Sequence, residues 1–497
     1  MKMVKSLLLG SAAGIVAVAG AQAADLPVKA KPVEYVKVCS LYGAGYYYMP
    51  GTDICLKLGG YVRWQISVGM GANITSGPHS GTGGRNTRRD SMDSAQRTRA
   101  LITVDTRQQT AYGTLRTYIL LGYSQDSTLA ETTSPNVYMT RGFIQIAEFT
   151  FGKATSFFDI VPGASFAYNA GMFYHPDTGD AGKMLAAYTA QFGNGVSGTI
   201  AIQQSNRRPI VNLSTAGSYS FVSLLAPINN SRGGGIGSAA APSAGINGLP
   251  DIVGNVRIDQ SWGTWLVAAA AHESSGGFYG TTLATGHPEN RWGWAATTGF
   301  ILNLPMFAPG DRLSAGIVYS EGAIAYAAVT PSGAAQVKFN GPQNVAWGFW
   351  EDAVYAAGGE VQLTTAWSAS AAFEHLWTPA LKTSWYGSYI DVSHNDTARG
   401  LICGTGPAGV LAASWGGAGC NPDWSAWNVG TRTQWEPVKG FIMGVDVIYN
   451  HLNSASANAA GTLVLTTASG GRPAGTYAVS DQNSWMGTFR VQRDFLP

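Results

Sequence analysis

The chain has 497 residues, with 31 Lys and Arg against 29 Asp and Glu, and 12% of its residues are charged. A typical globular protein has about twice that share of charged residues, and the near balance of the two signs excludes the basic excess of a nucleic-acid-binding protein. We therefore expect no nucleic-acid partner. Apolar residues make up 45% of the chain, yet the mean hydropathy is only +0.02. Beyond the N-terminus, no apolar stretch has the roughly 18 residues that a membrane helix needs, which excludes a helical membrane bundle.

The N-terminus has the three parts of a secretory signal peptide. Lys2 and Lys5 precede a short apolar run from Leu7 to Ala19, and Ala21-Gln22-Ala23 supplies a small-x-small cleavage site. The sequence therefore predicts that residues 1–23 are removed on export, which takes two lysines and leaves the mature chain formally neutral. The alternative, a membrane helix, is disfavoured because the run is short and ends in the cleavage site.

Apolar and polar residues alternate along many segments of about ten residues, the pattern of a half-buried β-strand. One face of the segment from Leu56 to Val68 takes Leu56, Leu58, Val62, Trp64, Ile66 and Val68, and the other takes Lys57, Tyr61, Arg63, Gln65 and Ser67. The alternation recurs in segments near Leu313, Trp427 and Phe441. Tight turns and long polar loops alternate between the segments, which predicts an all-β transmembrane antiparallel β-barrel with one apolar and one polar face.

The predicted strands number sixteen, and a single-chain bacterial barrel is expected to have an even number. They begin near Leu56, Gln96, Gly113, Met139, Thr150, Lys183, Gly195, Asp251, Thr264, Arg291, Asp311, Val361, Leu381, Trp424, Gly440 and Ser484. The segment Ala346–Gly359 fits either a loop or a further pair of strands, which leaves the count open by two.

The sequence contains no recognisable catalytic or metal-binding motif, so we expect neither an enzyme nor a cofactor. Residues Gly235 to Ala240 match G-x-G-x-x-A, but no apolar strand precedes them and no helix pattern follows, so this segment is interpreted as a loop. Three alternatives stay open. A soluble secreted β-propeller would need a blade repeat that the chain lacks, an enzymatic barrel would need a Ser, His and carboxylate set, and a purely structural barrel is separable only by conduction.

The four cysteines form two local pairs, Cys39 with Cys55 and Cys403 with Cys420. In an exported protein, a disulfide within each pair is the simplest interpretation, and free buried thiols are the alternative. The first disulfide would close a short periplasmic lead (24–55) that precedes the barrel domain (56–497).

Several segments, in the same order along the chain, resemble the general porins of alphaproteobacteria. They are Val38–Tyr48, Pro50–Asp53, Cys55–Arg63, Thr110–Tyr118, Arg141–Gln145, Thr150–Asp159, Ala372–His375, Trp377–Pro379, Cys420–Trp424 and Phe489–Phe495. The resemblance implies a sixteen-stranded homotrimer in the bacterial outer membrane, in contact with lipid and lipopolysaccharide. It also implies that the third external loop, at about 159–182, folds into the pore. The expected function is passive diffusion of small hydrophilic solutes and ions.

The alternation and the resemblance together predict a pore constriction. The polar face of the first four strands carries Arg63, Arg99, Arg107, Arg116 and Arg141, and the inward loop carries Asp159, Asp177 and Asp180. Charges of opposite sign across a narrow channel would orient and filter solutes. The alternative is that these arginines pair with carboxylates and stiffen the wall. The neutral net charge does not decide between cation and anion preference.

The C-terminus departs from the usual barrel pattern. Outer-membrane barrels usually end on an aromatic residue that the barrel-assembly machinery recognises, whereas Leu496 and Pro497 follow Phe495 here. The prediction is that the machinery binds the last strand through Phe495.

Overall fold

The computed structural model describes fourteen segments of the chain. They are residues 37–69, 94–127, 136–160, 163–168, 174–176, 182–205, 208–213, 249–280, 282–328, 336–340, 344–404, 418–456, 458–465 and 474–495. The predicted signal peptide, the Gly235–Ala240 segment, Asp177, Asp180, Leu496 and Pro497 lie outside these residues.

Sixteen antiparallel strands form one closed sheet, because β2 pairs with β3 on one side and with the last strand, β24, on the other. The sixteen are β2 (Cys55–Val68), β3 (Ser94–Thr110), β4 (Gly113–Asp126), β5 (Asn136–Ile146), β6 (Phe149–Ala154), β7 (Lys183–Gly193), β8 (Val196–Gln203), β10 (Asp251–Gln260), β11 (Gly263–Ser274), β12 (Arg291–Asn303), β13 (Arg312–Glu321), β18 (Thr365–Thr378), β19 (Leu381–Ser393), β20 (Trp424–Val438), β21 (Phe441–Asn453) and β24 (Gln482–Asp494). A two-residue strand, β1 (Tyr47–Tyr48), adds to the edge of β2. The predicted barrel is confirmed, and a single closed sheet excludes a propeller.

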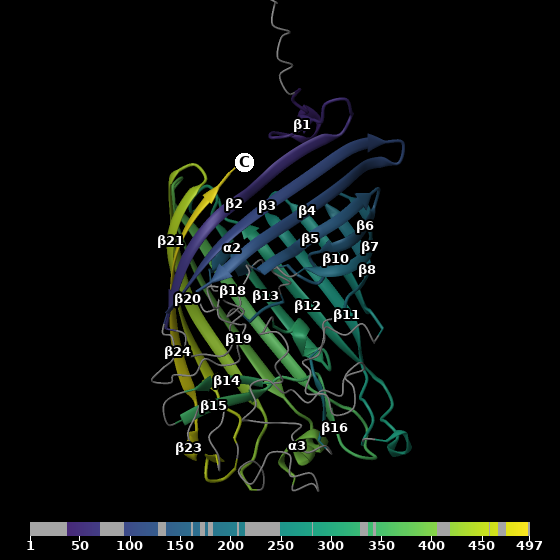
Figure 1. Cartoon of the computed structure of the whole chain (residues 1–497), viewed down its shortest axis with the longest axis vertical. Helices are drawn as coiled ribbons and strands as arrows, with labels where there is room; N and C mark the ends of the chain where they lie inside the picture. The colour runs from purple at the N-terminus through teal and green to yellow at the C-terminus, as the bar shows by residue number, and fades with distance from the viewer. Residues whose placement is uncertain are drawn as a thin grey trace, which may run out of the picture.

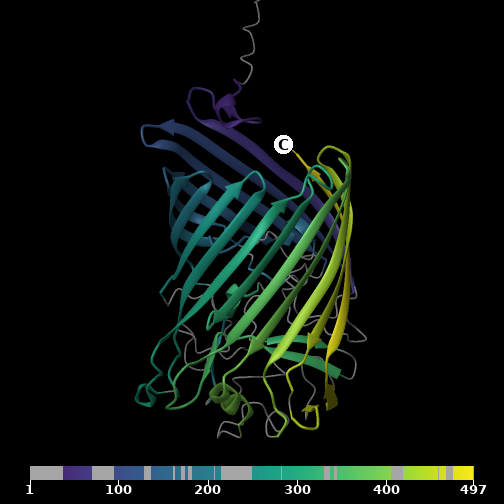
Figure 2. The same cartoon turned by 180° about the vertical axis from the view of Figure 1, so that it is seen from behind.

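Tight turns lie at one end of the barrel and long connections at the other (Figure 1). The turn at Asn194-Gly195 shows the local cause, since both residues have positive φ, as a two-residue hairpin turn requires. β1 and the end of β24 lie at this turn end (Figures 1 and 2). Long and short connections alternate as predicted.

Two small sheets lie at the opposite, loop end. One contains β14 (Gln336–Asn340), β15 (Asn344–Phe349), β22 (Thr462–Leu465) and β23 (Gly475–Val479), and the other contains β9 (Ile210–Asn212), β16 (Ala353–Tyr355) and β17 (Gln362–Leu363). The segment Ala346–Gly359 therefore contributes short strands to these sheets, and none to the barrel.

Helices are few and short among the described residues. They are η1 (Ser40–Tyr42), α2 (Gly163–Phe166), η3 (Leu283–Thr285), η4 (Ile324–Tyr326) and α3 (Asp396–Cys403). No helix in the described part of the chain is both long and apolar enough to cross a bilayer.

The two faces of the barrel wall follow the predicted alternation. In β2, Val62 and Trp64 are exposed on the outer face, whereas Gln65 and Ser67 are buried on the inner face. An apolar outer face suits contact with lipid, because hydrocarbon chains offer no partner for polar groups.

The described part of the third external loop, which contains α2, lies inside the barrel, as the resemblance implied (Figure 1). Its helix α2 lies against β18 and β19. The Ser384 hydroxyl on β19 donates to the carbonyl of Phe166 (2.7 Å), and the backbone N–H of Tyr174 donates to the hydroxyl of Ser388 (2.7 Å). The loop therefore crosses from the end of β6 to the far wall.

The inner face is less uniformly polar than the alternation predicted. On β19 and β21, the inward residues Ile390, Ile448 and Leu452 are fully buried and belong to one large apolar cluster. The cluster also contains Ile324 and Trp350 from the long connection between β13 and β18. These inner positions tolerate apolar side chains because folded loops cover them and exclude water.

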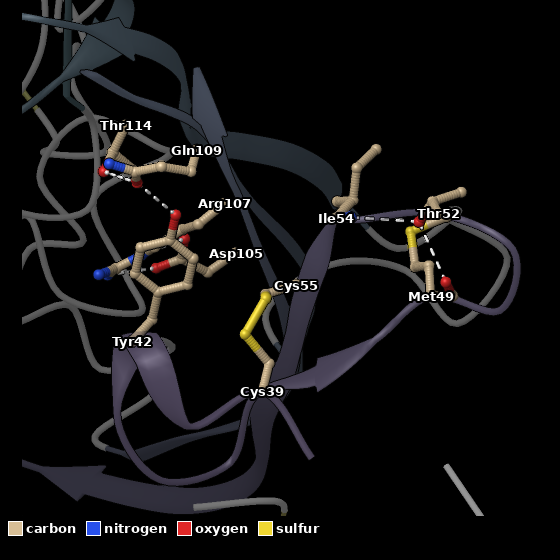
Figure 3. Close-up of a disulfide and its surroundings, with 10 residues drawn as sticks. All are labelled: Cys39, Tyr42, Met49, Thr52, Ile54, Cys55, Asp105, Arg107, Gln109 and Thr114. Carbon is tan, nitrogen blue, oxygen red and sulfur yellow. Dashed lines mark hydrogen bonds and ion pairs between the residues drawn. A yellow bond between two sulfur atoms is a disulfide. The ribbon is translucent and has the colours of Figure 1, made fainter. Parts of the chain in front are cut away.

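Both predicted disulfides are present. Cys39 is bonded to Cys55, which ties the lead to the first residue of β2 (Figure 3), and Cys403 at the end of α3 is bonded to Cys420. One disulfide therefore constrains the turn end and the other the loop end.

Reduction of either disulfide is expected to destabilise the fold. Each bond closes a loop of 16 or 17 residues, which corresponds to about 3 kcal/mol in the chain-entropy model. We expect the Cys39→Ser/Cys55→Ser variant to lose this amount in urea unfolding of the refolded protein. If the double variant and the parent unfold at the same urea concentration, the disulfide has no such role.

Candidate functional site

The five predicted arginines lie on four adjacent strands of the inner wall. Arg63 is on β2, Arg99 and Arg107 are on β3, Arg116 is on β4 and Arg141 is on β5. The strand register places Arg63 opposite Arg99, and Arg107 opposite Arg116. Like charges in cross-strand positions repel each other, so each pair depends on neighbouring groups.

Asp105 compensates one of these pairs. Its carboxylate lies 3.2 Å from the Arg107 guanidinium and 2.8 Å from that of Arg116, and it is almost fully buried. These two arginines therefore pair with a carboxylate of the wall. Asp105 was not among the predicted site residues, although the alternation places it on the same face, two residues from Arg107.

The N-terminal lead covers the turn end of this wall (Figure 3). The Arg107 guanidinium lies over the rings of Tyr42 and Tyr46, at 5.5 and 5.0 Å from their centroids, and the Tyr42 hydroxyl donates to Gln109 (3.1 Å). Burial, reinforced by a hydrogen bond to Asp105, raises the pKa of Tyr46 to about 12. The Tyr46 hydroxyl therefore remains a hydrogen-bond donor to Asp105 into the alkaline pH range.

The other three arginines contact aromatic rings or the base of the inward loop. The Arg63 guanidinium lies 4.8 Å from the Tyr61 ring, and that of Arg99 lies 5.3 Å from the Tyr138 ring. Arg141 donates to the Thr155 hydroxyl (3.0 Å), and Thr155 follows the last residue of β6. Arg141 thus joins the wall to the loop.

Asp159 lies at the base of the inward loop. Its backbone N–H donates to the carbonyl of Ser156 (3.2 Å), and its carboxylate is close enough to influence Lys183 and Tyr326 electrostatically. Of the three predicted loop acids, the structure describes this one. Its role at a constriction stays a prediction.

A second charged group lies on the wall that the inward loop reaches. Glu374 on β18 is almost fully buried, and its carboxylate lies 3.0 Å from Arg312, 3.4 Å from Lys382 and 3.0 Å from Arg432. The Arg312 guanidinium also lies 4.8 Å from the ring of Phe166 in the loop.

Tyr168 joins the end of the described loop segment to the same wall. Its backbone N–H donates to the buried carboxylate of Asp446, which also accepts from the Tyr386 hydroxyl. Its ring lies 3.9 Å from the Arg490 guanidinium and 5.4 Å from that of Arg432. One carboxylate and two cations therefore position this part of the loop.

The arginines of β2 to β5 and the charged residues around Glu374 and Asp446 are parts of one charged surface, which we call the basic arc. It follows adjacent strands from β13, through the seam between β24 and β2, to β5. We define the basic arc by nine cations, Arg312, Lys382, Arg432, Arg490, Arg63, Arg99, Arg107, Arg116 and Arg141, and by the three buried carboxylates among them, Glu374, Asp446 and Asp105. Lys57, Arg97 and Asp494 also have inward positions on these strands, so cations predominate along this wall.

A Ser, His and Asp set lies near the loop end but lacks catalytic geometry. The Ser205 hydroxyl and the Asp251 carboxylate approach the same ring atom of His272, Nδ1, at 3.2 and 2.8 Å. A catalytic triad places the nucleophile and the acid on different ring nitrogens. This set is therefore a structural hydrogen-bond network.

The external connections are joined by an ionic cluster around His394. The ring of His394 lies 2.9 Å from Glu351 and 3.0 Å from Asp423, and Asp423 also pairs with Arg399 on α3. Burial alone would lower the pKa of His394, but the hydrogen bonds to Asp423 and Glu351 outweigh burial and raise it to about 9. The cluster holds three segments of the loop end together while His394 is charged.

Stability is expected to fall at alkaline pH because of His394. Unfolded histidine has a pKa of about 6.5, so the raised value contributes roughly 3 kcal/mol that is complete below about pH 6.5 and lost as pH rises through about 9. The measurement is the urea unfolding free energy of the parent and of His394→Gln at pH 6 and pH 10. We expect the difference between them to shrink at pH 10, and an unchanged difference would contradict this assignment.

Comparison with known proteins agrees with this geometry. A family model described as a porin subfamily matches residues 25–488. The porin Omp2b of Brucella suis is 33% identical over 282 residues, and that of Brucella melitensis is 32% identical over 283 residues. Each match covers 54% of this chain and 66% of the relative, slightly less than two thirds of its length.

A solved structure has the same fold. The outer membrane channel DcaP of Acinetobacter baumannii aligns with 90% of this chain and 99% of its own, at a TM-score of 0.52 and 10% identity. At that identity, the likeness concerns the fold alone. Because the family model spans nearly the whole chain, and because the closed barrel carries an inward loop, the chain is a member of the porin subfamily.

Proposed function

We propose that this chain is exported to the bacterial outer membrane and forms a passive aqueous channel for small hydrophilic solutes and ions. The observation that carries the proposal is the basic arc on the inner wall of a closed barrel with an apolar outer face. Charged groups along a pore replace part of the hydration of a passing ion. Family membership points to a channel rather than an enzyme.

The inward loop narrows the path by size, and the basic arc filters by charge. Guanidinium groups stay charged throughout the physiological pH range, so the arc provides a field that does not vary with ordinary changes in pH. Solutes move down their own gradients, without an energy source. With nine cations against three carboxylates, the wall favours anions over cations of similar size.

The assembly proposed here is a homotrimer that contacts outer-membrane lipid and lipopolysaccharide. The barrel-assembly machinery recognises the last strand through Phe495, whose backbone N–H donates to the carbonyl of Gly60 at the closing seam (3.0 Å). The constriction is formed by the arginines of β2 to β5 and by Asp159, Asp177 and Asp180 of the loop segment.

The test is single-channel recording of the purified, unheated protein in a planar bilayer, with the reversal potential measured under a KCl gradient. We expect large conductance steps in groups of three and a reversal potential of the sign for chloride preference. A silent, folded barrel would overturn the channel and support a structural role. Single, independent steps would overturn the trimer, and cation preference would show that the acids of the inward loop dominate the field.

A further inference from the structure

A cavity of about 370 Å³ lies where β4, β5 and β6 meet the start of the inward loop. Its lining includes Tyr118, Phe143 and Gln145 from the strands and Thr155 and Phe157 from the loop. The strand residues share the parity of Arg116 and Arg141, which places the cavity on the lumen side of the wall. A solute that passes the inward loop therefore has access to it.

We infer that this cavity is a binding site for small aromatic carboxylates, solutes that combine one planar apolar ring with one negative charge. The inference rests on the proposed function, because it assigns a solute class to the same channel. Binding sites for small molecules usually have volumes of about 300–1,000 Å³ and combine apolar walls with a few polar groups. The volume of 370 Å³ suits a single-ring solute.

The apolar side of the cavity is suited to a flat ring. The rings of Tyr118 and Phe143 are stacked, with centroids 5.3 Å apart and an interplanar angle of 24°. Phe157 and Leu120 complete the apolar lining. A further aromatic ring gains both area burial and ring-ring contact in such surroundings.

The polar side provides positive charge in a fixed orientation. Arg141 lines the cavity, and its guanidinium is held by hydrogen bonds to the carbonyl of Thr140 (2.8 Å) and the hydroxyl of Thr155 (3.0 Å). The Arg116 guanidinium lies beside the stacked rings, 5.3 Å from Tyr118 and 5.4 Å from Phe143, but it pairs with Asp105, so the charge that faces the cavity is that of Arg141. Arginine binds carboxylates with strong, charge-assisted hydrogen bonds, so the site selects an anion over a neutral or cationic ring.

Amide and hydroxyl groups extend the polar side without adding negative charge. Gln145 on β5 accepts a hydrogen bond from Arg116 on β4 (3.1 Å) and donates one to Thr150 on β6 (3.1 Å), and these two bonds fix its side chain. A neutral sugar would also find ring faces and hydroxyl partners here, but it would not use the charge of Arg141. The charge of the site therefore favours an aromatic carboxylate over a sugar.

The experiment is a current-block titration in planar bilayers. Sodium benzoate is added to open channels in KCl, and acetate, benzyl alcohol, benzylammonium and glucose are tested in the same way. We expect saturable block by benzoate at concentrations at which the other four probes have little effect. Equal block by acetate would show a general anion effect, and stronger block by glucose would show a sugar site, and either result would overturn the inference.

Three variants locate the site. Phe143→Leu removes the stacked ring and Arg141→Gln removes the charge, and each is expected to raise the half-blocking concentration of benzoate roughly tenfold. Thr155→Trp fills the cavity from an exposed loop position and is expected to abolish the block of the KCl current by benzoate. The matched control is Arg257→Gln, because Arg257 is a lumen-facing arginine of β10 that pairs with Asp259 instead. Unchanged block in all three site variants would overturn the inference.

Failure of the channel and failure of the site are distinguishable. A protein without KCl conductance contradicts the proposed function, and the site is then tested directly by saturation-transfer NMR of benzoate with the detergent-solubilised protein. Transfer in the parent that is lost in Thr155→Trp supports the site, and equal transfer in both contradicts it. A conducting channel without benzoate block or transfer contradicts the site alone.

Discussion

Replacement of Glu374 by alanine is expected to lower the free energy of unfolding by about 3–5 kcal/mol, the usual cost of breaking a buried ion pair. Glu374 is the carboxylate that Arg312, Lys382 and Arg432 share, and both Glu374 and Arg432 are only 3% exposed. Without it, three like charges remain close together in a region of low dielectric constant. The measurement is urea unfolding of the reconstituted barrel, followed by fluorescence.

The same variant is expected to strengthen anion preference, because one negative charge leaves the lumen wall. Glu374→Gln keeps the shape and separates the loss of charge from the loss of volume. The matched control is Glu360→Gln, because Glu360 is 82% exposed and lies 3.9 Å from Arg291, where a surface pair contributes little. If the Glu374 and Glu360 variants unfold alike, the buried cluster does not stabilise the barrel.

Replacement of Asp446 by alanine is expected to release the end of the inward loop. Asp446 is fully buried and accepts from the backbone N–H of Tyr168 and from the Tyr386 hydroxyl. Its removal leaves both donors without this acceptor, at a cost of about 3–5 kcal/mol. Because the loop then blocks the lumen less completely, we expect a larger and noisier single-channel conductance than in the parent.

Asp446→Asn is the informative companion, because it keeps an acceptor oxygen for Tyr168 while removing the charge. We expect it to keep the parent conductance level with a shifted reversal potential. Identical conductance in the alanine variant and the parent would show that Asp446 does not hold the loop.

The fold was largely predictable because the barrel wall obeys a strict local rule. Side chains alternate between the lipid-facing and the lumen-facing side, so the side on which Trp64 or Arg63 lies can be predicted from the local sequence alone. The largest error in a strand start, Val361 against Thr365, falls where β17 pairs with β16 in a small loop sheet. Pairings within folded loops leave no such periodic pattern.

The placement of charge was predictable on one wall and incomplete on the other. The arginines of β2 to β5 could be assigned to one inner face because their strands are consecutive, and their role at a constriction stays a prediction. Arg312 and Arg432 also have the polar parity, but their convergence on Glu374 depends on barrel closure and on the path of the inward loop. The apolar lumen around Ile390 and Trp350 was missed for a related reason, because burial there is produced by loops and not by the wall.

The seam between the first and last strands has a consequence for the order of folding. Arg490 donates to Gln65 (3.1 Å) and the Ser67 hydroxyl contacts that of Thr488 (2.8 Å), across more than 400 residues of chain. Contacts between such distant residues are slow to form, and these need the final strand to be synthesised first. Every other strand pairing of the wall can precede them, so the continuous line of charge through Arg63 and Arg490 arises in the last step. For the channel proposed above, barrel closure therefore completes the charged wall and the selective pore in one step, which an unclosed chain with the same strands and loops would lack.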